Sequence, residues 1–231
     1  MILTENWEKH AEYGYRHRHY IQALSCGPMV YLRTLKCGST FFYYNLVDWG
    51  WEEINFSDIK WQTQIVFSHI MEPIRRRHKA IAEYIFMTNT WNLLFDNPKI
   101  QQFVQRIPLL DSHSVSYHDY YGQLSWLIDW VPLSTDHAEN TVLTERLLNY
   151  GAGIATFRWD ADHAHPGHAI KKEIENKLIE LWGQEQPEPR EYVDFYLERD
   201  QLLYQTVMQQ FDKNGVTWPK TSWLRNRLRY Q

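Results

Sequence analysis

An apolar run that stops on a lysine is the feature that most constrains the fold of this chain. Residues 30–46 read VYLRTLKCGSTFFYYNL: an apolar segment ends at Lys36, passes through small residues at 37–40 and becomes aromatic again. A short apolar run bounded by turn-forming residues predicts a buried strand. The segment after it has the length of a helix, so the stretch predicts a strand that turns directly into a helix, as in α/β proteins.

The same alternation continues along the chain. Strands are predicted at residues 28–35, 63–70 and 124–133. Helices are predicted at residues 39–48, 74–87, 98–105, 169–182 and 190–211, with a further helix that Ser134 or Thr135 caps and that runs to Tyr150. Loops are predicted at residues 111–123 and 151–167. This order predicts an α/β fold with a small parallel sheet flanked by helices.

Length, charge and cysteine content narrow the class of protein. The 231 residues, 44% of them hydrophobic, suit one domain, and a net charge of -4 argues against a general nucleic-acid binder. No signal peptide is recognisable, and no segment approaches the roughly 20 apolar residues that span a membrane. Cys26 and Cys37 form neither a CxxC pair nor a disulfide framework. We therefore expect a cytoplasmic protein with no membrane or nucleic-acid partner.

The turn at residues 36–40 has the composition of an anion site. The first N–H groups of a helix lack intrahelical partners and carry the positive end of its dipole. Gly38 allows an anion to approach the backbone, Ser39 and Thr40 add hydroxyl donors, and Lys36 adds a positive charge. A Walker A loop has its lysine after the second glycine, whereas Lys36 precedes Gly38, so an ATP- or GTP-dependent enzyme is the lesser alternative.

A second strand-to-helix turn follows at residues 67–84, FSHIMEPIRRRHKAIAEY. The strand runs into Glu72 and Pro73, and Pro73 suits the first helical position, where its missing N–H is not needed. The basic residues at 75–79 then lie near the carboxyl edge of the sheet, where α/β proteins bind ligands. Two such turns suit a ligand with two phosphate groups; the alternative is a solvated basic helix face.

Together these segments resemble the sulfotransferases that use 3'-phosphoadenylyl sulfate (PAPS), especially the carbohydrate and heparan branch. Residues 36–40, KCGST, are similar to the family's K-[TSV]-G-[ST]-[TS] loop. Residues 71–76, MEPIRR, stand in the place of its R-[DE]-P-x-x-R element, with Arg76 as the final arginine. Residues 196–204, YLERDQLLY, are similar to a Y-x-x-D-x-x-L-[FY] pattern near the family's C-terminus.

The resemblance implies a P-loop-like three-layer core and transfer of a sulfuryl group from PAPS to an acceptor hydroxyl, by default of a carbohydrate, with no metal expected. It divides the single domain 1–231 into an N-terminal extension (1–27), a cofactor-binding core (28–150) and a helical C-terminal part (151–231). The implied cofactor-binding residues are Lys36, Cys37, Gly38, Ser39, Thr40, Arg76 and Lys79. The chain departs from the family pattern at Met71, where an arginine is expected, and at Lys79, where a serine is usual.

Catalysis of this transfer depends on positioning and charge stabilisation, together with a base for the acceptor proton. By the resemblance, Lys36 stabilises the leaving 5'-phosphate. The first candidate base is Glu53, because residues 53–58, EINFSD, look like a segment that carries a catalytic glutamate in some heparan sulfotransferases. His113 and then His69 are the other candidates.

Other features of the sequence bear on metals, on alternative functions and on the acceptor. A group of possible metal ligands, Asp160, Asp162, His163, His165 and His168, matches no known metal-site spacing, so we predict no metal there. A non-catalytic nucleotide- or anion-binding protein on the same fold is the main alternative, and a kinase is a weaker one. The aromatic segment 117–121 is the expected place for acceptor contacts.

Overall fold

The computed structural model describes residues 21–87, 116–134, 137–152, 158–160, 168–182 and 191–214. The strands are β1 (Ala23–Cys26), β2 (Met29–Leu32), β3 (Glu52–Ile54), β4 (Ile65–Ile70) and β5 (Asp129–Pro132). The α-helices are α2 (Ser39–Asp48), α3 (Pro73–Met87), α6 (Tyr117–Tyr121), α7 (His137–Ala152), α8 (His168–Trp182) and α9 (Glu191–Asn214). Short 3-10 helices span Phe56–Asp58 and Gly122–Trp126. The predicted α/β class is confirmed.

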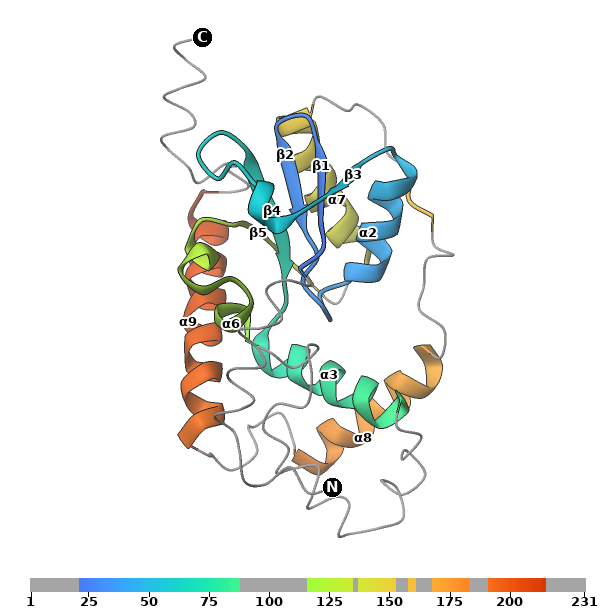
Figure 1. The fold of residues 1–231 in the computed structure, drawn as a ribbon. Coiled ribbons are helices and arrows are strands. Elements are labelled where there is room, and N and C mark those ends of the chain that lie inside the picture. The colour runs from blue at the N-terminus through green and yellow to red at the C-terminus, as the bar shows by residue number, and fades with distance from the viewer. Residues whose placement is uncertain are drawn as a thin grey trace.

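The five strands form one sheet in the order β3-β1-β2-β4-β5 (Figure 1). Strands β2, β4 and β5 are parallel, whereas β1 is antiparallel to both β2 and β3. The prediction of a purely parallel sheet is therefore wrong, because it missed β1 and β3. β1 lies inside the segment assigned to the N-terminal extension and joins β2 through Gly27 and Pro28, with Gly27 at a φ of 55°.

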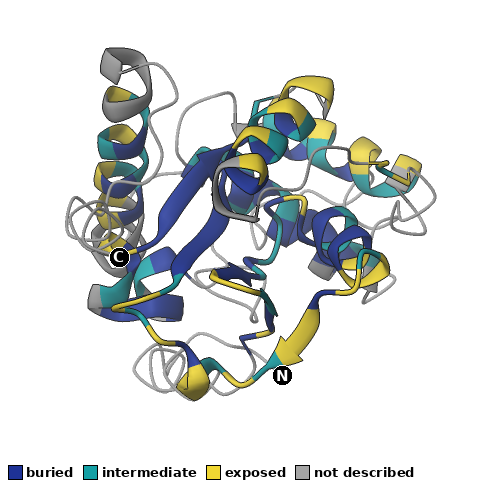
Figure 2. Ribbon diagram, turned by 90° about the horizontal axis from the view of Figure 1, so that it is seen from above, coloured by how far each residue is buried: buried dark blue, intermediate teal, exposed yellow. Residues whose placement is uncertain are grey.

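Helices cover both faces of the sheet. On one face, the ring of His69 in β4 stacks on Phe42 of α2, with 3.8 Å between ring centroids, and bonds to Thr144 of α7. On the other face, Trp130 of β5 packs against Tyr117 and Tyr121 of α6, and α9 contacts both α6 and β5. The central strands are buried between these layers, as Figure 2 shows in dark blue.

Helix α3 occupies a different position. It begins directly after β4, but in Figure 1 it runs across the carboxyl edge of the sheet instead of returning along a face. Its main partner is α8, and it also contacts α9. The α3–α8 pair therefore covers the edge of the sheet at which α/β proteins bind their ligands.

Most predicted helices agree with the structure. The bounds of α2 match the prediction, Pro73 is the first residue of α3, and α8 and α9 lie within a few residues of their predicted bounds. The loop predicted at residues 111–123 is wrong in its second half, where α6 forms, and residues 124–126 of the third predicted strand are 3-10 helix. The helix predicted at 98–105 lies outside the described residues. None of the described helices is long and apolar enough to cross a membrane.

The buried His69 predicts a pH dependence of stability. Burial lowers the pKa of His69 to about 3 from its ordinary 6.5, so the unfolded chain takes up the proton at higher pH than the folded protein. Stability is therefore lost as the pH falls from 6.5 towards 3, and about 2 kcal/mol of unfolding free energy should disappear between pH 7 and pH 5. In His69→Gln, urea denaturation should show a correspondingly smaller change over this interval. Equal pH dependence in both proteins would contradict the assignment.

Candidate functional site

The loop between β2 and α2 is fixed by contacts with β4 and α6. The hydroxyl of Thr34 lies 2.6 Å from that of Ser68 in β4 and 2.5 Å from that of Tyr121 in α6. The Cys37 N–H donates to the Thr34 carbonyl over 3.3 Å. Lys36 adopts a φ of 66°, a left-handed conformation that is costly for a residue with a side chain and is found in no other non-glycine residue of the described segments. The surrounding contacts hold this strained backbone in place.

Gly38 begins α2 in a left-handed conformation, with a φ of 64° and a ψ of 14°. No side-chain hydrogen bond caps this end of the helix. A Cβ atom on Gly38 would lie only 3.0 Å from Cε2 of Phe42, so a larger residue there requires the Phe42 ring to shift. The start of α2 thus places an exposed glycine at the positive end of a helix dipole.

The hydroxyl of Tyr117 joins this loop to the end of β4. It donates to the Met71 carbonyl over 2.8 Å and accepts the Met71 N–H over 2.9 Å. The Cys37 sulfur lies 3.2 Å away, and because the hydroxyl proton is already used, the thiol is the donor in that contact. Burial raises the pKa of the Cys37 thiol, which keeps it protonated for this role.

The carboxylate of Asp200 on α9 holds Tyr117 in turn. It accepts the backbone N–H of Tyr117 over 3.0 Å and that of His118 over 3.4 Å. Asp200 is only 4% exposed and belongs to the C-terminal segment that carried part of the family resemblance. The structure thus connects that segment to the loop between β2 and α2 through a single aromatic residue.

Arg76 lies beneath the same loop. It is 3% exposed, its Nε donates to the Leu35 carbonyl over 3.1 Å, and its guanidinium stands 4.5 Å from the centre of the Tyr117 ring. A second aromatic ring, that of Tyr120, is 5.7 Å away. Arg76 therefore supports the backbone just before Lys36, a role that the sequence did not reveal.

The Lys36 side chain extends toward α3. Its Nζ lies 2.8 Å from Oε2 of Glu83, and the same oxygen lies 2.7 Å from Nζ of Lys171 on α8. Burial raises the pKa of Glu83, but hydrogen bonds and charge from Lys171 and Lys36 outweigh it and hold the pKa at about 2. The three side chains expose between 6% and 15% of their surface, so this is a largely buried cluster of two cations around one anion.

The second predicted anion site is differently arranged. The carboxylate of Glu72 caps α3, accepting the N–H of Ile74 over 3.1 Å and that of Arg75 over 2.7 Å. Met71 is buried, whereas Lys79 is 28% exposed and lies 3.7 Å from Glu175 on α8. The N-terminus of α3 is therefore occupied by a carboxylate of the chain itself, and any phosphate near it would depend on side chains such as Lys79.

The candidate bases lie in different places. Glu53 is exposed on β3 and accepts a hydrogen bond from the hydroxyl of Tyr43 on α2. His69 is buried with its Nε2 2.9 Å from the Thr144 hydroxyl, and its low pKa keeps it neutral. His113 lies outside the described residues. The Lys36 side chain therefore contacts α3, whereas the Glu53 side chain contacts α2.

Two further predictions concern the acceptor and metals. Tyr117, Tyr120 and Tyr121 are at most 4% exposed, so these rings pack in the core rather than presenting an acceptor surface. Of these possible ligands, the structure describes Asp160, whose backbone N–H and carbonyl bond to the Asn45 side chain, and His168, the first residue of α8. Among the described residues, no group of three or more histidine, cysteine, aspartate or glutamate side chains could hold a metal ion.

No protein family model, curated protein or solved structure matches this chain. The residues that sequence reasoning missed are Tyr117 as the connecting hydroxyl, and Glu83 and Lys171 as partners of Lys36. One signal was present: Lys79 and Glu83 on α3, and Lys171 and Glu175 on α8, are each four residues apart with complementary charges. That spacing fits the antiparallel pairing of the two helices that the ion pairs show.

Removing the Tyr117 hydroxyl tests its connecting role. Tyr117→Phe leaves the buried Met71 N–H and carbonyl without that partner, which should cost about 1–3 kcal/mol of unfolding free energy. Tyr44→Phe, on an exposed tyrosine of α2, is the matched control and should change stability little. Equal stabilities of the two variants in urea denaturation would refute this role.

A pair of glycine variants separates backbone strain from steric contact. Gly38→Ala and Gly27→Ala both place a side chain on a left-handed residue, at a cost of about 1–2 kcal/mol each. Only Gly38→Ala also brings a Cβ against Phe42, since nothing lies within 4 Å of that position at Gly27. Gly38→Ala should therefore lose more unfolding free energy than Gly27→Ala, and equal losses would show that Phe42 adapts freely.

Proposed function

We propose that this chain is a sulfotransferase that uses PAPS as donor. The observation that supports the proposal best is the start of α2, where an uncapped helix opens at Gly38 directly behind Lys36. This turn follows β2, which is parallel to β4, so it lies at the carboxyl edge of the sheet. A lysine before the glycine, combined with a helix start that has no side-chain cap, suits a phosphosulfate group better than a Walker-type triphosphate.

Within this proposal, the donor's 5'-phosphosulfate lies at residues 36–40, on a P-loop-like core. Its 3'-phosphate is bound by Lys79, because Met71 and Arg76 are buried and Glu72 fills the N-terminus of α3. Arg75 precedes Lys79 by four residues and is the second cation on that side of α3. This assignment differs from the family pattern, in which arginines from the start of the helix bind that phosphate.

The proposed reaction is an in-line transfer. The acceptor hydroxyl oxygen attacks the donor's sulfur, the bond from sulfur to the 5'-phosphate oxygen breaks, and a base takes the acceptor proton. Lys36 stabilises the charge that develops on the leaving phosphate, and the N–H groups at the start of α2 hold its oxygens. Glu53 and His113 remain the proposed bases, and a carbohydrate hydroxyl remains the proposed acceptor.

A second candidate function is binding of a nucleotide or another anion without catalysis. Met71 favours it, because this residue is buried where the family pattern has an arginine. Glu72 and Glu83 also place carboxylates of the chain at both predicted phosphate positions. A ligand must displace or accommodate these carboxylates, which weakens binding relative to a site without them.

Calorimetric titration with PAP, the desulfated product of PAPS, tests the proposal. We expect micromolar binding of PAP, weaker binding of ATP with or without Mg²⁺, and a loss on the order of tenfold in PAP affinity in Lys36→Met, because a charge-assisted hydrogen bond to phosphate is removed. Replacement of the exposed Lys172 by methionine provides the control.

Absence of PAP binding, or a preference for ATP, would refute the proposed donor. If PAP binds but no sulfuryl transfer to a panel of carbohydrate, phenolic and amine acceptors is detected with PAPS, the non-catalytic candidate is supported instead.

A further inference from the structure

The cluster formed by Lys36, Glu83 and Lys171 has a geometry that matches an anionic ligand. Both ammonium groups contact the same carboxylate oxygen, Oε2 of Glu83, so the two nitrogens lie no more than 5.5 Å apart. One phosphate or sulfate group can contact two ammonium groups at this separation, since each N⁺–H···O⁻ bond spans about 2.8 Å. The Glu83 oxygen thus stands where an oxygen of such a group could stand.

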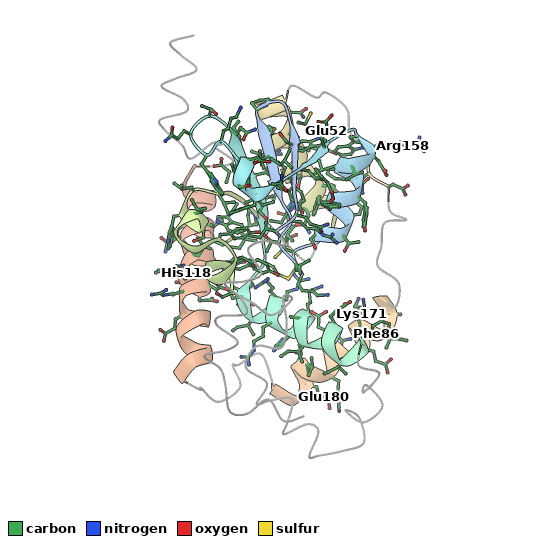
Figure 3. All side chains as sticks on the ribbon, in the orientation of Figure 1. Glu52, Phe86, His118, Arg158, Lys171 and Glu180 are labelled. Carbon is green, nitrogen blue, oxygen red and sulfur yellow. The ribbon has the colours of Figure 1, made fainter. Side chains whose placement is uncertain are left out.

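Lys171 is held firmly in this position. Its Nζ lies 4.8 Å from the centre of the Phe86 ring on α3, and its side chain is 12% exposed. Figure 3 shows Lys171 on α8 beside Phe86, where the two helices pack together. A lysine with a fixed ammonium group loses less side-chain entropy on binding an anion than a mobile surface lysine does.

The position of α3 brings this cluster to the proposed site. Because α3 crosses the carboxyl edge of the sheet, Glu83 reaches Lys36 although it lies ten residues beyond the start of the helix (Figure 1). Helix α8 packs on α3, so Lys171 reaches the same carboxylate from α8. An anion at Lys36 would then lie between the uncapped helix end and the α3–α8 pair.

We propose that Lys171 is a second cation of the anion site, and that Glu83 competes with the ligand's anionic oxygen for Lys36 and Lys171. The identity of the ligand as a nucleotide phosphosulfate rests on the proposed function; the two-lysine site itself does not. Glu83 also keeps the two ammonium groups together despite their mutual repulsion. Binding of a phosphate or sulfate group transfers this role from the carboxylate to the ligand.

Inorganic pyrophosphate is a probe that carries the phosphate chemistry without the nucleoside. Calorimetry should show that Lys171→Gln weakens pyrophosphate binding on the order of tenfold, whereas Lys171→Arg and the matched exposed control Lys172→Gln keep it. Glu83→Gln removes the competing charge and should bind pyrophosphate several-fold more tightly than the unmodified protein. Thermal unfolding of each variant shows whether it is folded.

The outcomes separate this inference from the proposed function. Unchanged pyrophosphate affinity in Lys171→Gln, weaker binding in a folded Glu83→Gln, or no pyrophosphate binding by the unmodified protein overturns the inference. If Glu83→Gln does not fold, the contrast between Lys171→Gln and Lys171→Arg decides. Pyrophosphate binding that depends on Lys171, without a preference for PAP over ATP, supports the two-lysine site and refutes only the proposed donor. Equal PAP affinity in Lys171→Gln and the unmodified protein refutes only the inference.

Discussion

The hydroxyl of Tyr117 is the contact on which the arrangement of the site depends. It bonds to both backbone groups of Met71 at the end of β4 and to the Cys37 thiol before α2, while Asp200 of α9 holds the Tyr117 backbone. Helix α6, the end of β4, the loop before α2 and helix α9 therefore meet at one buried residue. Because buried polar groups are costly without partners, these contacts favour a single arrangement of the loop and support the left-handed backbone at Lys36.

Electrostatics around the loop follow an alternating pattern. On α3 and α8, Lys79 faces Glu175 and Glu83 faces Lys171, so the two helices pair through opposite charges. Lys36, in the loop after β2, is the second cation that contacts Glu83. The protein's net charge of -4 thus coexists with a locally cationic cluster, because attraction of an anion depends on the nearest charges in a poorly solvated site.

The sequence predicted correctly those helices whose ends are determined by residues within or beside them. Helix α2 and the start of α3 were predicted from glycine, proline and the change from an apolar run to a helical pattern, and the structure agrees. β1 and β3 were missed because they read Ala-Leu-Ser-Cys and Glu-Glu-Ile, and neither contains an apolar run long enough to predict a strand. Their pairing comes from the sheet edge they extend, which is information that lies outside the segments themselves.

The direction of a side chain was harder to predict than its position. Arg76 and Lys79 both lie on α3 in a basic run, yet Arg76 is buried beneath the loop and Lys79 remains partly exposed. The two residues are three apart and so are neighbours on the helix surface, and only the packing of α6 against α3 and β4 shows that Arg76 is turned into the core. Lys171 illustrates the same limit, since 135 residues separate it from Lys36, and only the position of α3 across the sheet edge brings the two to one carboxylate. A motif can therefore locate a loop, whereas the charges that surround the loop depend on which helix the fold places opposite it.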